Sequence, residues 1–371
     1  MSNDKRILWP DISKGIGILM VVFFHSILPG LRTTFAVKAV FNLLQETHMP
    51  LFFFLSGWLF ELKADRTVQH RGRSLWNRFL RLMVPYFVFT IIYYTATNLA
   101  LMIPSIESLL TMSNGGYAHY SLLESLYQIF TFDGHMAESL WFLYALFLIS
   151  VVNILMPRLT RHPAFVAAII PLCMVPRFFP DFFHTFKILS LVLYYLFYFS
   201  LARALFPRTD RLFCMKKPTY LAVVLGYLAT SFATVIVLEM NVWHLPNDVA
   251  HHLYPIVRQV AAVFGIFVIC TFAQYISQTK AAKPLGFLGR KSMVIYLIHA
   301  PILTQAVTAL TARLLPKLPL IIYFLTGTAV GISVPLLLDW LVISRVPLLN
   351  TILTGAPYRQ KSAGGRSLPP I

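Results

Sequence analysis

The sequence predicts an all-α, polytopic integral membrane protein with about ten transmembrane helices and both termini in the cytoplasm. Three observations predict this fold class. First, 57% of the 371 residues are hydrophobic and 12% are charged, whereas a soluble domain typically carries about 25% charged residues. Second, apolar runs of about 20 residues, the length needed to cross a bilayer, recur along the whole chain. Third, lysine and arginine alternate between the connections in the way that orients membrane helices.

Ten runs satisfy the length requirement for a membrane span. Pro171 and Pro176 interrupt the fifth run and make it the weakest. The first run follows basic residues, as in a signal peptide, but no small-x-small cleavage site comes after it, so it is interpreted as an uncleaved first span. The predicted spans are 12–31, 38–61, 82–103, 138–156, 164–180, 186–206, 219–240, 255–275, 291–312 and 319–344.

The basic residues set the orientation of these spans. With the N-terminus inside, 24 of the 31 lysines and arginines fall on one face and 7 on the other. Residues 104–137, the longest outward connection, contain neither lysine nor arginine, and the stretch "SLLESLYQIF" within it has the apolar period of a helix lying on the membrane surface. Residues 1–345 are expected to form one transmembrane domain, and 346–371 a disordered cytoplasmic tail.

Charge and cysteine content exclude several other classes of function. A net charge of +17 is typical of nucleic-acid binding, but these cations lie between apolar runs, where membrane topology explains them, so no nucleic-acid partner is expected. Cys173, Cys214 and Cys270 are far apart and lack metal-ligand spacing, so neither a metal site nor a disulfide framework is expected. Phosphate-binding loops, the hydrolase elbow and the zinc-protease motif are absent.

The first run, "DISKGIGILMVVFFHSIL", carries three ionisable residues. Lys14 and His25 are eleven residues apart, which is close to three helical turns and about 16 Å along the axis. Asp11, three residues before Lys14, lies on the same face. An ionisable residue inside a span is costly and is a candidate for function. Lys14 is alternatively a boundary residue that extends to the membrane surface, and His25 a hydrogen-bonded packing residue.

Histidine and arginine also occur in the next two runs. His48 lies near the outer end of the second span, just before Pro50, which removes a backbone donor and opens the helix locally. It is either an interfacial residue or part of a site with His25. Arg78 and Arg81 are three residues apart and can face one way. They are either topological anchors or a clamp for phosphate, which arginine binds in bidentate fashion.

Two later runs contain further candidates. Glu138 and Ser139 lie at the outer boundary of the fourth span, where a carboxylate can orient a histidine or bind a sugar hydroxyl. Tyr296 and His299 share one helical face of the ninth span with Ser292. This face is either a structural hydrogen-bond ladder or part of the chemistry.

Five stretches together resemble the family-3 membrane acyltransferases, and within that family the branch related to fucose 4-O-acetylases. They are "DISKGIGILMVVFFHS", "HMPLFFFLSGWLF", "RFLRLMVPYFVF", "LWFLYALF" and "LGRKSMVIYLIHAPI", in the expected order over about residues 5–344. The first two are the more specific. Lys14 stands where many members have arginine, and the chain lacks the extracytoplasmic hydrolase-like domain that many members add.

The resemblance implies a ten-helix enzyme of the bacterial inner membrane that moves an acyl group, usually acetyl, from cytoplasmic acetyl-CoA to a carbohydrate hydroxyl at the outer face. It implies His25 as the catalytic histidine and Lys14, Arg78 and Arg81 as contacts to the phosphates of CoA. Acetyl-CoA is then a donor, with no permanently bound cofactor. The missing domain favours a stand-alone enzyme.

A mechanism follows from these expectations. The pantetheine arm of CoA is comparable in length to the Lys14–His25 separation, so the thioester reaches His25, which takes the proton of the acceptor hydroxyl. Asp11, His48, Glu138, Ser139, Tyr296 and His299 are candidates for binding substrate or orienting His25.

A direct transfer and an acyl-histidine intermediate both stay open. The alternative function is a transporter or flippase of a polar or lipid-linked sugar, because intramembrane histidine and lysine also suit proton-coupled transport. The sequence does not identify the acceptor, the acyl group or the oligomeric state.

Overall fold

The computed structural model of the protein describes residues 7–102, 140–173, 175–179, 187–239, 246–299 and 302–354, together with Ser121, Leu123, Glu124, Tyr127 and Phe182. All regular secondary structure in these residues is helical, and none of them lies in a strand. The all-α class predicted from the sequence is confirmed.

The helices follow one another along the chain without large irregular insertions in the described residues. The long ones are α1 (Trp9–Ser26), α2 (Phe35–Glu61), α4 (Arg71–Leu101), α8 (Trp141–Leu155), α9 (Pro163–Leu172), α12 (Lys187–Leu205), α14 (Lys217–Ala233), α15 (Asn247–Ile276), α16 (Ala282–His299), α17 (Ile302–Leu314) and α18 (Leu320–Leu338). Shorter ones are α3 (Ala64–Gln69), α10 (Val175–Phe178), α13 (Thr209–Leu212) and α19 (Pro347–Thr354). Single turns of 3-10 helix (η1, Pro29–Leu31; η2, Phe206–Arg208) and of π-helix (η3, Thr234–Glu239; η4, Asp339–Ile343) continue or connect them.

A helix occupies each of the ten predicted ranges, but fewer are long and apolar enough to cross a membrane alone. Five segments of the described chain are, and α16 with α17 makes a sixth if the pair is one bent span. α8 and α9, with 15 and 10 residues, are shorter than the roughly 20 residues of a full span. Ten spans and cytoplasmic termini therefore stay predictions. The five segments are Arg71–Ala96, Lys187–Leu212, Lys217–Ile236, Leu253–Ile276 and Leu320–Ile343.

The predicted ninth span, 291–312, is not one straight helix. α16 ends at His299, α17 begins at Ile302, and the two helices are bent relative to each other by 66°. The sequence has Pro301 between them. Proline lacks an N–H group and disfavours helical geometry in the preceding residue, so a helix tends to end there. The break places His299 in the last turn of α16.

The C-terminal region also differs from the expectation in part. A disordered tail was expected from residue 346, but Pro347–Thr354 form α19, which packs against α4. Residues 355–371 lie outside the described part of the chain, so the boundary of the transmembrane domain stays a prediction.

The outward connection begins its helical stretch with a reciprocal cap. The Ser121 N–H donates to Glu124 Oε2 over 2.8 Å, and the Glu124 N–H donates to Ser121 Oγ over 3.2 Å. This is the capping-box arrangement. These hydrogen bonds hold the pKa of the Glu124 carboxyl below its usual value, because they favour its charged form.

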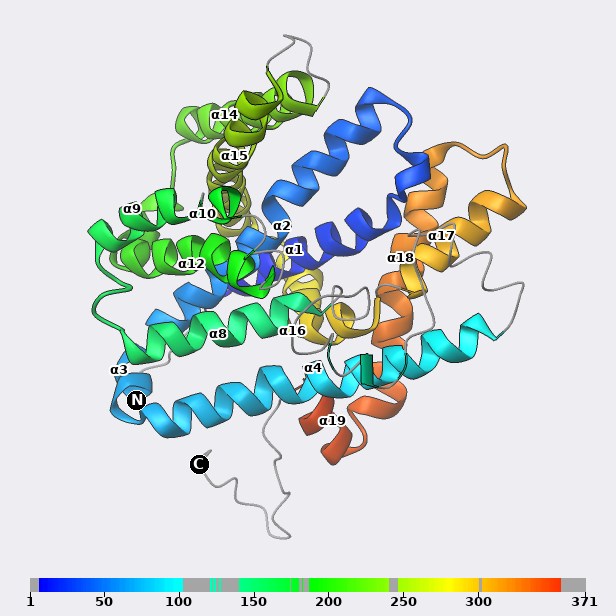
Figure 1. The fold of residues 1–371 in the computed structure, drawn as a ribbon, viewed down its shortest axis with the longest axis horizontal. Coiled ribbons are helices and arrows are strands. Elements are labelled where there is room, and N and C mark those ends of the chain that lie inside the picture. Colours follow the sequence, from blue (N-terminus) through cyan, green and yellow to red (C-terminus); the bar gives the residue numbers. More distant parts are fainter. Residues whose placement is uncertain are drawn as a thin grey trace.

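α1 and α16 lie next to each other at the centre of the molecule, with α2 beside α1 (Figure 1). α12 and α15 pack against α2, α18 packs against both α1 and α16, and α4 lies alongside α8. Fully buried apolar side chains such as Ile12 and Ile18 of α1 and Phe53 and Phe54 of α2 fill the space between these helices. The three helices that carry the predicted histidines are thus the innermost ones.

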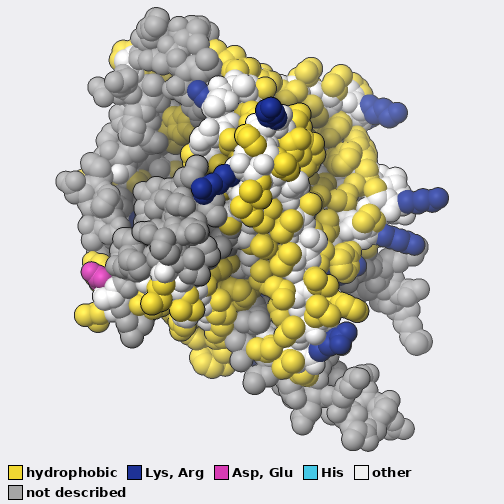
Figure 2. Space-filling model, turned by 90° about the vertical axis from the view of Figure 1, so that its right-hand side faces the viewer, with side chains coloured by type: hydrophobic (Ala, Val, Ile, Leu, Met, Phe, Trp, Pro, Cys, Tyr) yellow, Lys and Arg dark blue, Asp and Glu magenta, His cyan; other side chains and the backbone are white. Residues whose placement is uncertain are grey.

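The outer surface is largely apolar. Figure 2 shows a face made mostly of hydrophobic side chains, with most of its lysines and arginines projecting near the margins. Trp340, Leu325 and Ile321 on the α18–η4 segment are 62%, 50% and 49% exposed. A soluble monomer rarely exposes so large a continuous apolar area, whereas a lipid-facing surface is expected to do so.

Candidate active site

The contact between α1 and α16 is set by two glycines. A Cβ atom added to Gly15 would overlap the carbonyl oxygen of Leu285, and one added to Gly289 would overlap the carbonyl oxygen of Asp11. Small residues allow membrane helices to approach this closely. His25 and His299 each follow the glycine of their own helix by ten residues, about 15 Å along the axis. The glycine contact therefore fixes both histidines at the same level of a parallel pair.

The two imidazole rings meet at that level. The ring centroids of His25 and His299 are 5.2 Å apart, with the planes inclined at 63°. His25 is half-buried, whereas His299 is only 1% exposed. His48, His299 and Arg32 are the groups that act electrostatically on His25. The histidine predicted as catalytic thus lies in a group of ionisable side chains rather than alone.

The hydrogen bonds of His299 define which of its nitrogens is free. Its Nδ1 lies 3.0 Å from the Ile295 carbonyl oxygen and 2.9 Å from that of Tyr296. Carbonyl oxygens only accept, so Nδ1 carries the proton and Nε2 is an acceptor. Nε2 is buried and has no hydrogen-bond partner among the described residues. Because buried polar atoms are nearly always paired, this one needs an explanation.

His48 approaches from α2. Its Nδ1 lies 2.5 Å from the Leu44 carbonyl oxygen, which assigns the proton to Nδ1 as in His299. Its ring centroid is 4.8 Å from that of Phe24, which is in turn 5.1 Å from the His25 ring. The structure therefore brings His25, His48 and His299 together from three helices.

Tyr296 lies one turn before His299, with ring centroids 6.0 Å apart. It is buried, and its hydroxyl is hydrogen-bonded to the backbone of Phe142 at the start of α8. Glu138 and Ser139, the other candidates at this end of α8, lie outside the described residues. Tyr296 therefore links the histidine group to the start of the helix that those two residues precede.

Two polar residues of α15 were not recognised from the sequence as site candidates. Arg258 acts electrostatically on His48, and its guanidinium lies 5.2 Å from the Tyr254 ring. Its Nε and the Nε2 of the adjacent Gln259 are buried without a partner among the described residues. Both interrupt an apolar run, which is a signal in the sequence, but the positive-inside pattern accounts for Arg258 as one of the seven outward cations and gives it no further role.

The sequence matches the model of one protein family over residues 7–340, a family described as an acyltransferase domain, Acyl_transf_3. The chain belongs to the family-3 acyltransferases. No curated protein and no solved structure matches it. Together with the apolar helices, the family match identifies a multi-pass membrane acyltransferase, as the resemblance implied. The fucose 4-O-acetylase branch stays a prediction.

The predicted CoA contacts of this acyltransferase lie apart from the histidines. Arg78 is half-buried, with its guanidinium 5.6 Å from the Phe60 ring, whereas Arg81 is exposed. Lys14 and Asp11 are half-buried near the start of α1, three turns before His25. The basic residues and the histidines thus occupy different levels of the helix bundle.

Proposed function

We propose that this acyltransferase moves an acetyl group from cytoplasmic acetyl-CoA to a hydroxyl of a carbohydrate or surface glycan on the periplasmic side of the bacterial inner membrane. The observation that carries the proposal is the buried Nε2 of His299, which lies next to the His25 ring and has no hydrogen-bond partner among the described residues. A hydrogen-bond acceptor atom that is buried in an apolar bundle in this way is suited to a proton, or to an N–H donor, that reaches it only during turnover. A transporter or flippase without covalent chemistry has no comparable support from the family match.

In the proposed reaction His25 is the base. It takes the proton of the acceptor hydroxyl while the oxygen attacks the thioester carbonyl carbon. The tetrahedral intermediate then expels the CoA thiolate as the C–S bond breaks, and the thiolate takes up the proton that His25 holds. The products are an O-acetyl ester and free CoA. A positioned histidine base typically contributes about 10²- to 10⁴-fold to the rate.

His299 and His48 support this base. His299 Nε2 is the acceptor for an N–H of His25, which stabilises the imidazolium that forms when His25 takes the proton. Its own Nδ1–H is held by two carbonyl oxygens, so its orientation is fixed before substrate arrives. His48 is held in the same way and is suited to donate to or accept from the acceptor sugar.

Arg258, which acts electrostatically on His48, supplies the acceptor side. Its Nε is a buried donor without a partner among the described residues, and a carbohydrate offers many hydroxyl oxygens that accept such a donor. Binding a hydroxyl here satisfies a group that is costly to leave unpaired. The predicted topology places this end of α15 outward, where the acceptor enters.

The test measures transfer of radiolabelled acetyl from acetyl-CoA to glycan in membranes with equal amounts of protein. His25→Ala is expected to lose at least about 100-fold in rate. His70→Ala, at an exposed turn away from the cluster, is the matched control and retains activity. A His25→Ala variant with activity within threefold of wild type, an order-of-magnitude criterion, overturns the assignment.

The two routes left open differ in one observable. Protein is incubated with labelled acetyl-CoA but no acceptor and then denatured rapidly in the cold near neutral pH, because acyl imidazoles hydrolyse in acid. Label that is present on wild type and missing from His25→Ala shows that an acyl-histidine forms. If the protein carries no label in that incubation, and glycan becomes labelled in a second incubation that contains it, the result supports direct transfer. Direct transfer needs no more than a base.

A further inference from the structure

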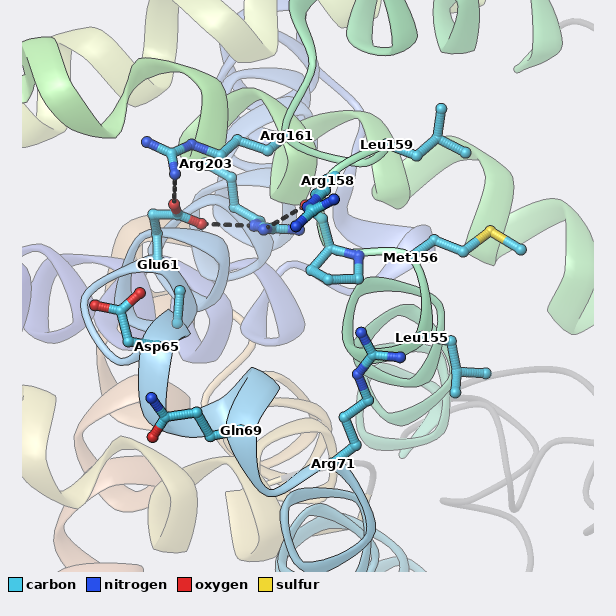
Figure 3. Close-up of a pocket in the computed structure, with 12 residues that line it drawn as sticks. Glu61, Asp65, Gln69, Arg71, Leu155, Met156, Arg158, Leu159, Arg161 and Arg203 are labelled. Carbon is cyan, nitrogen blue, oxygen red and sulfur yellow. Dashed lines mark hydrogen bonds and ion pairs between the residues drawn. The ribbon is translucent and has the colours of Figure 1, made fainter.

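A second polar region lies at the far end of α2. An open cavity of about 910 Å³ is lined by the end of α2, by α3, by the start of α4 and by the α8–α9 connection (Figure 3). Four arginines and two carboxylates line it, which gives a formal charge of +2. These residues are Arg71, Arg158, Arg161, Arg203, Glu61 and Asp65.

One wall of this cavity is held rigidly by Arg203, which is 2% exposed. Its Nε donates to Glu61 Oε2 over 2.8 Å, its NH1 to Asn153 Oδ1 over 2.7 Å and to Thr160 Oγ1 over 2.5 Å, and its NH2 to the Pro157 carbonyl oxygen over 2.9 Å. Arg203 thereby ties α12 to α2, α8 and the α8–α9 connection. Four of its five N–H donors are used by the protein, so we assign it the role of shaping the cavity.

The other arginines are available to a ligand. Arg161 NH1 lies 3.0 Å from Glu61 Oε1, and its side chain is 52% exposed. Arg71 and Arg158 are exposed, and neither has an acidic partner within the part of the chain that the structure describes. Figure 3 shows Arg71 pointing from α4 toward the connection that carries Arg158. Because Glu61 is already neutralised, the cavity presents unpaired positive charge.

The cavity and the histidine group are separated by a distance that suits one extended ligand. Glu61 and His48 are thirteen residues apart on α2, about 20 Å along the helix axis. Arg78 lies seven residues after Arg71, on the same face of α4 and about 10 Å further along. Arg78 and Arg203 both lie beside the Phe60 ring, at 5.6 and 4.8 Å. Positively charged side chains therefore extend from the cavity along α4 as far as Arg78.

We propose that this cavity binds the phosphate groups at the nucleotide end of acyl-CoA, with Arg71, Arg158 and Arg161 as the contacts. The inference rests on the proposed function, because it takes acyl-CoA as the donor. Guanidinium groups bind phosphate oxygens in bidentate fashion, and the volume is within the range of roughly 300–1,000 Å³ of small-molecule sites. With the phosphates held here, the pantetheine arm extends along α2 and brings the thioester to the histidines. Arg78 lies on that path.

The experiment uses the purified full chain in neutral detergent. Binding of CoA and of adenosine 3′,5′-bisphosphate is measured calorimetrically for wild type and for the double variant Arg71→Ala with Arg158→Ala. Each charge-assisted phosphate contact is worth about tenfold in affinity, so the variant is expected to bind both probes at least about tenfold more weakly. The matched control is Arg208→Ala with Arg211→Ala, two exposed arginines outside the cavity, which retains wild-type affinity.

A second probe isolates the phosphates from the rest of the donor. S-acetylpantetheine lacks the nucleotide, so the double variant is expected to use it as well as wild type does, while its KM for acetyl-CoA rises. Unchanged binding of both nucleotides in the double variant overturns the proposal. The proposal is also overturned if the double variant binds phosphatidylglycerol vesicles more weakly than wild type but keeps its nucleotide affinity, because the cavity is then a site for lipid headgroups.

The outcomes separate this inference from the proposed function. Wild-type protein that binds CoA through Arg71 and Arg158 but transfers no acetyl group refutes the function and supports the cavity. Protein that transfers acetyl with the same KM for acetyl-CoA in wild type and double variant refutes the cavity and supports the function. His25→Ala provides the link, because it is expected to abolish transfer and leave nucleotide affinity intact.

Discussion

Glu61 offers a comparison of two arginines bound to the same carboxylate. Arg203 is 2% exposed, whereas Arg161 is 52% exposed, and each donates to a different oxygen of Glu61 at 2.8 and 3.0 Å. Replacing Arg203 by methionine removes four hydrogen bonds and leaves Asn153, Thr160 and the Pro157 carbonyl without their donor. Breaking a buried pair by removing one partner costs about 3–5 kcal/mol. Removing an exposed partner costs about 0–1 kcal/mol.

The assay is reversible unfolding in mixed micelles of increasing sodium dodecyl sulfate, followed by tryptophan fluorescence. Arg203→Met is expected to lower the free energy of unfolding by about 3–5 kcal/mol, and Arg161→Ala by less than about 1 kcal/mol. Equal losses for the two variants, or a loss below about 1 kcal/mol for Arg203→Met, refute the view that burial decides the strength of these interactions.

Three further predictions concern the catalytic end. Gly15→Ala or Gly289→Ala is expected to separate α1 from α16, to lower activity and to cost about 1–3 kcal/mol in stability. Gly72→Ala, where an added Cβ has open space, is the control. Equal activity and equal unfolding free energy in the control and in either variant contradict the role of the glycine contact. His299→Ala is expected to lower kcat by about 10- to 1,000-fold, with little change in the KM for acetyl-CoA or for the acceptor. Steady-state kinetics that show a change in KM alone contradict the view that His299 stabilises the protonated His25. Arg258→Ala is expected to raise the KM for the acceptor about tenfold without changing the KM for acetyl-CoA, and the reverse pattern places Arg258 on the donor side.

The long helices could be predicted because hydropathy indicates them directly. A run of about 20 apolar residues has few alternatives to a helix in a membrane, since every backbone group must be paired within the chain. The break after His299 was missed although Pro301 lies next to it, because a proline inside an apolar run is compatible with a kinked span as well as with an ended helix. α19 was missed because eight residues next to a polar tail give a weak local signal.

The candidate site could be predicted only in part, for a similar reason. Periodicity places Asp11, Lys14 and His25 on one face of α1, because that information is local. The pairing of His25 with His299 depends on a contact between residues more than 270 positions apart in the sequence, through Gly15 and Gly289. Nothing in a single sequence states which helix a glycine faces.

Charged residues were the hardest to interpret. Arg203, Arg158 and Arg161 satisfied the positive-inside pattern, and that explanation hid the network around Glu61. Arg258 was likewise explained as an outward cation, and that explanation concealed its position beside His48. A cation that fits the topology can also have a specific partner, and only its neighbours in three dimensions distinguish the two cases.

The glycine contact between α1 and α16 also limits which parts of the enzyme can move. Two helices whose backbones touch cannot slide or tilt without losing that packing, so we expect His25 and His299 to keep their relative geometry during catalysis. Any movement that admits a substrate has to come from helices around this pair, such as α2 with its internal Pro50 or α17, which is bent by 66° relative to α16. The reacting groups are then held in place, and the movements that substrate entry needs fall to the surrounding helices.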